Sequence, residues 1–263
     1  MEHLRAVARA DGVGQDVLVH EVAMAFSGLG AEPVELVTLC RRIVSRQPSV
    51  GALWTLCARV LCSPEPIDTA WAFVEELDTD RTGEHAIESD DAGPIAVIGW
   101  PPMVASALMD RPDLETIVVD AAGLGGRLAV RLEQGGARAH DVPSEGLGAA
   151  VASASLLVVE AEVAGPTGAV VAPGGYAAAA VGHHAGVPVR LAVPAGRMLP
   201  PMHFDVADER SVRPDTPWES RVERLPLDIV DQIARPDGTR STSAALRQPA
   251  DGPIAPELNT RIA

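Results

Sequence analysis

Gly174 and Gly175 stand directly before an alanine-rich stretch, residues 176–181, which predicts a tightly packed helix. Glycine lets the backbone approach a ligand closely, and the free N–H groups at a helix N-terminus favour an anion. The stretch follows a short apolar run, 156–159, of the kind expected for a buried parallel strand. Together these residues predict an anion site where a strand is followed by a helix.

A second glycine cluster, within residues 118–127, has the order strand, glycine turn, helix. Gly123 and Gly125 fit the first two glycines of a GxGxxG dinucleotide fingerprint, but Leu128 occupies the third position. Asp141 ends the next predicted strand, where a ribose hydroxyl would bind. Two interpretations stay open: a nucleotide or S-adenosylmethionine site, or a tight turn that needs glycine for its geometry alone.

Arg46 and Arg127 are the best candidates for holding a phosphate, because a guanidinium binds phosphate in a bidentate manner. A solvated surface position is the alternative for either arginine. His183 and His184 are adjacent in a predicted helix, so their side chains point roughly 100° apart and do not share a ligand. A structural role at the helix C-terminus is favoured for this pair, and no metal site is predicted.

The elements that would position these groups alternate in type after residue 93. Short apolar runs at 95–98, 116–119, 138–142, 156–159 and 187–193 predict strands, and helical stretches at 126–134 and 144–152 lie between them. Strands alternating with helices imply a parallel sheet. The fold class is therefore α/β, with a Rossmann-like, doubly wound sheet whose ligand site lies at the carboxyl ends of the strands.

The chain before this sheet has a different pattern. Residues 1–77 are predicted to be helical, with apolar stripes at 33–46 and 49–62 and a further helix after Pro64 and Pro66. Residues 78–93 are acidic and nearly free of large apolar side chains, which predicts a linker. The predicted division is a helical domain over 1–77, a linker over 78–93 and a Rossmann-like domain over 94–263. An edge strand is expected at 220–225 and a short docked helix near the C-terminus.

Composition limits the partners. The 263 residues have a net charge of −15, so direct nucleic-acid binding is not expected. The chain has no lysine, which excludes Schiff-base catalysis. Cys40, Cys57 and Cys62 are odd in number and lack CxxC spacing, so reduced thiols and a cytoplasmic location are predicted. No run reaches the roughly 18 consecutive apolar residues of a membrane span, so no membrane partner is expected. No cofactor is expected either.

Four motifs occur in order along residues 160–188. They are EAE at 160–162, TG at 167–168, APGGY at 172–176 and HHAGVP at 183–188. They are similar to GAD or GAE, NG, NKIGT and HH.VP of the family that joins the alpha, beta and delta subunits of translation initiation factor 2B to sugar-phosphate isomerases. Earlier, SRQPSVGALW resembles the family's RPTSVNL and places Arg46 on its arginine, and the tail IAPELNT resembles VTPPELIT.

The resemblance implies a site, a homodimer formed mainly by the C-terminal domain, and substrates such as methylthioribose 1-phosphate. The catalytic aspartate of the isomerases falls on Glu162. Their catalytic cysteine falls on Trp100, and the asparagine and lysine of NKIGT fall on Ala172 and Pro173. The family's ligand-binding ESRP becomes DAAG, beginning at Asp120.

We therefore expect the isomerase scaffold without isomerase turnover, because aldose–ketose isomerisation needs a positioned acid and base. The protein would bind a phosphorylated sugar or nucleotide, or act through protein contacts. Trp100 would fill the vacated site or stack on a ligand ring. The alternative is an active enzyme that uses Glu162 and Asp120. It would be either an aldose–ketose isomerase or an enzyme that depends on a nucleotide or on S-adenosylmethionine. The candidate ligand-binding residues are Arg46, Gly99, Trp100, Gly126, Arg127, Gly174, Gly175 and Tyr176.

Overall fold

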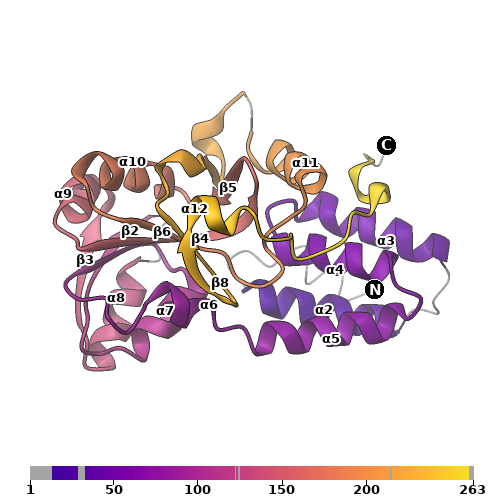
Figure 1. The fold of residues 1–263 in the computed structure, drawn as a ribbon, viewed down its shortest axis with the longest axis horizontal. Coiled ribbons are helices and arrows are strands. Elements are labelled where there is room, and N and C mark those ends of the chain that lie inside the picture. Colours follow the sequence, from indigo (N-terminus) through magenta and orange to yellow (C-terminus); the bar gives the residue numbers. More distant parts are fainter. Residues whose placement is uncertain (1–13, 29–32, 122, 124, 214, 261–263) are drawn as a thin grey trace.

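The computed structural model describes residues 14–28, 33–121, 123, 125–213 and 215–260. A group of helices lies at one end of the molecule and a sheet covered by helices lies at the other (Figure 1). The helices are α2 (Gln15–Ser27), α3 (Pro33–Arg46), α4 (Gly51–Leu61) and α5 (Pro66–Asp78). The α/β class and the predicted order, helices first and sheet second, are confirmed.

Helix α4 is the centre of the helical part. Its apolar stripe is buried, and Leu53, Trp54, Leu56 and Cys57 have no accessible surface. The neighbouring helices α2, α3 and α5 all contact it. The same apolar core includes Val163 from the sheet, so the helical part and the sheet share buried surface.

The sheet has the strand order β3-β2-β1-β4-β6-β8-β9, and β5 and β7 branch from β4. Its strands are β1 (Ile95–Ile98), β2 (Glu115–Asp120), β3 (Arg138–Pro143), β4 (Leu156–Gly165), β5 (Gly168–Val171), β6 (Val189–Ala192), β7 (Glu223–Leu225), β8 (Gln232–Arg235) and β9 (Gly238–Ser241). The pairs from β3 to β8 along this order are parallel. The order reverses between β1 and β4, which is the switch point of a doubly wound sheet.

Helices cover both faces of the sheet (Figure 1). On one face lie α6 (Thr82–Ala86), α7 (Pro102–Met109) and α8 (Gly125–Gln134), and on the other lie α9 (Leu147–Ala152) and α10 (Gly175–Ala185). Strand β1 contributes alternate residues to the two cores, because successive side chains of a strand point to opposite faces. Burial on both faces explains the continuous apolar runs in the sequence.

The five predicted strands between residues 95 and 193 are all present, and the predicted edge strand corresponds to β7. Two features differ from the sequence-based expectation. Strand β4 does not end near Val159 but continues to Gly165 and turns back as β5 in an antiparallel hairpin. The β8–β9 hairpin was also not predicted.

Residues 78–93, predicted as a linker, pack against the sheet domain. They contain α6, which contacts α7 and β8, and Thr82 and Ala86 are fully buried. Arg190 of β6 reaches this segment and forms an ion pair with Asp91, with 2.6 Å between Nη1 and Oδ2. At least one acidic side chain of residues 78–93 therefore neutralises a buried arginine.

The C-terminal segment crosses back to the helical part, as the prediction of a docked helix requires. Helix α11 (Pro201–Ser211) packs on β4, and the short 3-10 helix η4 (Pro256–Asn259) contacts α3, α4 and α11. Leu258 is fully buried in the helical core. Among the described residues, no helix has the length and apolar character needed to cross a bilayer.

Candidate functional site

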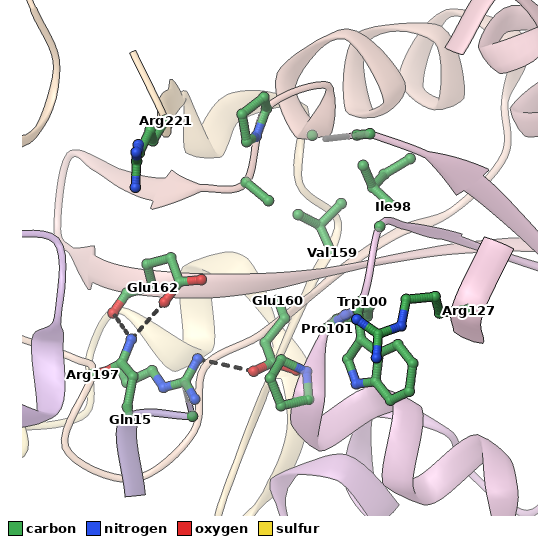
Figure 2. Close-up of a pocket in the computed structure, with 17 residues that line it drawn as sticks. Gln15, Ile98, Trp100, Pro101, Arg127, Val159, Glu160, Glu162, Arg197 and Arg221 are labelled. Carbon is green, nitrogen blue, oxygen red and sulfur yellow. Dashed lines mark hydrogen bonds and ion pairs between the residues drawn. The ribbon is translucent and has the colours of Figure 1, made fainter. Parts of the chain in front are cut away.

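A cavity of about 520 Å³ lies at the carboxyl ends of β1 and β4, at the switch point (Figure 2). Its walls come from the loop after β1, the end of β4, the loop between β5 and α10, the start of α2 and the arginines 127, 197 and 221. This is where doubly wound sheets bind their ligands. Its volume lies in the range of small-molecule sites.

Glu160, near the carboxyl end of the parallel part of β4, is a buried carboxylate in the cavity wall. Its Oε2 accepts the backbone N–H groups of Met103 at 2.9 Å and Val104 at 3.2 Å, in the first turn of α7. Its Oε1 lies 2.9 Å from Nη1 of Arg197. Burial raises the pKa of the Glu160 carboxyl, the Arg197 guanidinium opposes the rise, and the nearby Glu162 carboxylate adds to it. The hydrogen-bond donors that hold the Glu160 carboxylate, two backbone N–H groups and one guanidinium, thus all come from this chain.

Glu162 lies in the same wall and is held by the helical part of the chain. Nε2 of Gln15, at the start of α2, donates to Oε2 of Glu162 at 2.7 Å and to its backbone oxygen at 2.9 Å. Oε1 of Gln15 in turn accepts the N–H of Ala52 at 3.0 Å. Figure 2 shows the Glu162 and Gln15 side chains directed toward each other. The Gln15 amide therefore fixes this carboxylate as an acceptor.

Trp100, Ala172 and Pro173, which the motif resemblance predicts to replace the catalytic cysteine, asparagine and lysine of the isomerases, all line the cavity. Trp100 is partly buried and packs against the core formed by α6, α7 and α8. None of the three side chains carries a charge or an acid at this position.

Arg127 is the positive group available to a ligand. It lies in the first turn of α8, is exposed and lines the cavity. Within the described part of the chain it has no hydrogen-bond or ion-pair partner. In Figure 2, Arg127 and Trp100 lie toward one end of the cavity and Arg221 lies toward the other.

Three helices begin around the switch point, and each N-terminus is occupied by a carboxylate of this chain. Glu160 accepts from α7 as described above. Oδ1 of Asp120 accepts the Gly125 N–H of α8 at 2.8 Å, and Oε1 of Glu223, in β7, accepts the Tyr176 N–H of α10 at 2.5 Å. Burial raises the pKa of Glu223, and the backbone N–H groups of α10 oppose the rise. Glu223 thus engages the Tyr176 N–H, one of the groups at the start of α10 that were predicted to be available to an anion, and the anion site at α10 stays a prediction.

The structure brings only part of the predicted set together. Gly99, Trp100, Arg127, Glu162 and Gly175 line the cavity.

The other predicted residues are not among its lining residues. Asp120 caps α8, and Gly174 adopts a left-handed φ of 88° before α10. A Cβ on Gly126 would lie 2.8 Å from the Asp141 carboxylate, so this glycine allows a close contact. Tyr176 is 46% exposed. Arg46 is exposed at the end of α3.

Sequence reasoning missed four groups that line the cavity: Gln15, Glu160, Arg197 and Arg221. Glu160 was within reach, because it stands two positions before Glu162 in a strand and so on the same side by alternation. Gln15 and Arg197 are far from Glu162 in sequence, and no motif marks them. Within the described residues no cluster of metal-ligating side chains occurs, and His183 and His184 are exposed.

No family model and no curated protein matches the sequence. Solved structures do match. The translation initiation factor eIF-2B of Pyrococcus horikoshii OT3 superposes with a TM-score of 0.75 at 18% identity, over 94% of this chain and 98% of that one. The eIF2B beta subunit of Chaetomium thermophilum gives 0.68 at 15% identity, over 92% and 88%. The tetrameric eIF2B-beta2-delta2 complex of C. thermophilum contains a chain that gives 0.66 at 16% identity, over 93% and 83%.

The superpositions extend over both the helical part and the sheet, since more than nine-tenths of the chain is covered in each. At 15–18% identity they establish the arrangement of the elements rather than the chemistry of the site. The resemblance predicted from the motifs at 160–188 is confirmed at the level of fold: this chain has the fold of the eIF2B subunits.

Proposed function

We propose that this protein is a divergent relative of the initiation factor 2B subunits and sugar-phosphate isomerases that binds a phosphorylated sugar without isomerising it. The observation that supports binding is the presence of a guanidinium and a carboxylate in the same cavity at the switch point. Arg127 offers a guanidinium to a phosphate, and Glu162, oriented by Gln15, offers a carboxylate oxygen to sugar hydroxyls. A polyhydroxy compound with a phosphate fits these two groups.

The same cavity lacks a proton-transfer pair. Isomerisation needs an acid and a base placed on either side of the reacting carbons. Trp100 replaces the thiol, and an indole N–H does not act as an acid near neutral pH. Asp120, the other candidate, is engaged as the cap of α8 and does not line the cavity. Glu160, the other carboxyl in the wall, is engaged by Arg197 and by the N–H groups of α7, so Glu162 remains without an available partner for proton transfer.

A nucleotide is the second candidate ligand, and Trp100 favours it. An indole in a cavity wall offers an apolar face on which a base can stack. In this arrangement Arg127 would bind the phosphate and Glu162 the ribose hydroxyls. The two ligand classes share the phosphate and the hydroxyls, and they differ only in the aromatic ring.

The protein is proposed to act as a homodimer in the cytoplasm. One of the similar structures is a tetrameric complex of beta and delta subunits, so this fold assembles in that protein. The cysteines 40, 57 and 62 are unpaired thiols, which is consistent with a reducing compartment. A role through protein contacts alone would need no ligand, and a binding titration distinguishes it from the ligand-binding role.

The test is a calorimetric titration with ribose 5-phosphate, methylthioribose 1-phosphate and adenosine monophosphate, combined with NMR detection of any ketose product. Binding of at least one compound without product formation is expected. Arg127→Met should weaken that binding roughly tenfold or more, because a charge-assisted hydrogen bond is lost. Arg131→Met, one turn further along α8 and outside the cavity, is the matched control. Absence of binding by every compound would favour the protein-contact role, and turnover would contradict the loss of isomerase chemistry.

A further inference from the structure

We propose that Gln15, the first residue of α2, is a positioning residue that makes the cavity select ligands with a hydroxyl group beside the phosphate. The inference rests on the proposed function and deepens it, since it names the group of this chain that orients Glu162 toward the ligand. It also makes the helical part of the chain a component of the site.

The Gln15 side chain is a buried amide that uses both of its ends. It is 5% exposed and lines the cavity together with Glu162. Its Oε1 accepts the backbone N–H of Ala52 at 3.0 Å, and its Nε2 donates to Glu162. A backbone N–H can only donate, so the amide oxygen must face Ala52 and the amide nitrogen must face Glu162. The direction of the hydrogen bond to Glu162 is therefore fixed from the helical part.

The contact with Ala52 holds the amide in place without a ligand. Ala52 lies in the first turn of α4, where the N–H groups have no partner within the helix. Val50, at the N-cap position, makes no side-chain hydrogen bond to them. Gln15 therefore caps α4 from a different helix. Because this N–H is buried, its pairing favours one position of the Gln15 side chain.

The hydrogen bonds from Gln15 leave one oxygen of Glu162 for a ligand. Nε2 donates to Oε2 at 2.7 Å and to the backbone oxygen at 2.9 Å. Oε1 accepts no hydrogen bond from the described residues. In Figure 2, two oxygens of Glu162 are joined to Gln15 by dashed lines, and the third points away from it. Oε1 is therefore the acceptor that remains in the cavity wall.

An oriented carboxylate oxygen discriminates among phosphorylated ligands. It accepts a hydrogen bond from a ligand hydroxyl, and it has no donor to offer. Arg127 lines the same cavity and offers its guanidinium to the phosphate. A phosphorylated polyol contacts both groups, whereas inorganic phosphate gains only the contact with Arg127. Without the Gln15 amide, binding of the hydroxyl would have to immobilise the Glu162 side chain, which costs affinity.

The experiment measures the affinities of ribose 5-phosphate and of inorganic phosphate by isothermal titration calorimetry on the full chain. Because both ligands contain the phosphate, the ratio of their affinities reports the contribution of the sugar hydroxyls. We expect the wild type to bind ribose 5-phosphate roughly tenfold or more tightly than inorganic phosphate. Gln15→Met should lower this ratio about threefold or more and leave the affinity for inorganic phosphate unchanged, since methionine keeps the length of the side chain but not its hydrogen bonds.

Thr55→Val is the matched control for a loss of packing. Thr55 is buried in α4, and its Oγ1 donates to the Gly196 carbonyl oxygen at 2.8 Å, so it also joins α4 to the segment beside the cavity. Its hydrogen bond does not involve Glu162. This variant should lower the melting temperature and keep the wild-type ratio. In a Glu162→Ala background, Gln15→Met should not lower the ratio further, because Gln15 acts through the Glu162 carboxylate.

A measurement on the wild type keeps the inference testable if Gln15→Met does not fold. The side-chain amide resonances of Gln15 should shift in NMR spectra on addition of ribose 5-phosphate, because the hydroxyl binds the carboxylate that accepts from this amide. Inorganic phosphate should leave them in place. Resonances that do not respond to bound ribose 5-phosphate would contradict the inference.

Other results would also overturn the inference. A wild-type ratio near one would show that the sugar hydroxyls add nothing. A folded Gln15→Met with the wild-type ratio, or an equal loss in Thr55→Val, would show that Gln15 only joins α2 to its neighbours. Preferential binding of ribose 5-phosphate to the wild type would still support the proposed function. If the wild type does not bind ribose 5-phosphate, the inference fails. The proposed function fails with it only if methylthioribose 1-phosphate and adenosine monophosphate do not bind either.

Discussion

At the scale of single residues, carboxylates of this chain cap the helices that begin around the cavity. Glu160, Asp120 and Glu223 each accept the first N–H groups of a helix, which is a favourable position for a negative charge. In a phosphate-binding sheet the same N–H groups would be left for the ligand. In this chain the three helix N-termini make internal contacts instead, so the proposed recognition of a phosphate would depend on Arg127.

The ion pair between Glu160 and Arg197 is the most sensitive of these contacts. Both side chains are more than nine-tenths buried, and Nη1 of Arg197 also donates to the Ala161 carbonyl oxygen at 2.7 Å. Arg197→Met should lower the free energy of unfolding by about 3–5 kcal/mol, because the Glu160 carboxylate would remain buried without its partner. Chemical denaturation at neutral pH measures the change.

The double variant Arg197→Met, Glu160→Gln is the control for that prediction. It removes the uncompensated charge and should recover part of the lost stability, since a neutral pair is tolerated better than a single buried ion. A double variant that is less stable than Arg197→Met would contradict the prediction. It would show that the contacts of the Glu160 carboxylate with the α7 N–H groups outweigh the cost of its unpaired charge.

At the scale of elements, the sequence was informative wherever periodicity and burial coincide. Strand β1 and helix α3 have the predicted bounds, because each has a continuous run or a regular stripe of apolar residues. The β4–β5 hairpin was not predicted because Gly165, Pro166 and Gly168 are typical of a loop and interrupt the valines of the two strands. Hairpin pairing adds backbone hydrogen bonds that such a composition does not reveal.

The candidate site was predictable only in part for a related reason. Trp100, Arg127 and Glu162 follow strands or glycine turns, so the rule for doubly wound sheets locates them. Gln15 reaches the site from the helical part, and Glu223 of β7 caps α10 beside it. Their contacts span more than 40 residues of sequence and depend on tertiary packing, which local patterns do not encode.

The junction of α4 with the site gives a prediction at this scale. A Cβ on Gly51, the first residue of α4, would lie 2.9 Å from the Glu162 carbonyl oxygen and 3.0 Å from Cα of Arg197. Gly51→Ala should therefore lower the free energy of unfolding by about 1–3 kcal/mol, since both neighbours are backbone atoms that must shift. Ligand affinity should fall with it, because Glu162 moves.

Gly148→Ala is the matched substitution for Gly51→Ala. Gly148 lies in α9, and a Cβ there would meet no atom within 4 Å. It should be neutral or stabilise the protein by roughly 0.5–1 kcal/mol, because alanine loses less backbone entropy than glycine in a helix. Equal thermal stability of the two variants would contradict the close packing of α4 against β4.

At the scale of the whole molecule, the C-terminal segment joins the sheet to the helices. Asp251 pairs with Arg235 of β8, and its backbone oxygen accepts from Arg59 of α4 at 2.6 Å. Further along, Leu258 is buried in the helical core. The C-terminal segment therefore contacts both the sheet and the helical part. Loss of one of its contacts should destabilise the whole fold.

The His203 contact makes this coupling dependent on pH. Nε2 of His203, in α11, lies 3.2 Å from both the backbone nitrogen and the backbone oxygen of Ala255, and the ring lies 5.8 Å from that of Trp54. Burial lowers the pKa of His203, and its contact with the Ala255 backbone opposes the shift. The unfolded chain, with a histidine pKa of about 6.5, therefore binds this proton more readily than the folded chain.

Because the unfolded state gains the proton first, stability is retained above about pH 6.5 and decreases as the pH falls below it, by at most about 1.4 kcal/mol per pH unit for one group. Urea unfolding between pH 5.5 and 7.5 measures this slope. His203→Phe should be less stable at pH 7.5 but should lose less stability on acidification, since the titrating group is gone. The difference between the two proteins isolates His203 from the carboxyls, and parallel slopes would show that the docking of the C-terminal segment does not depend on the neutral imidazole.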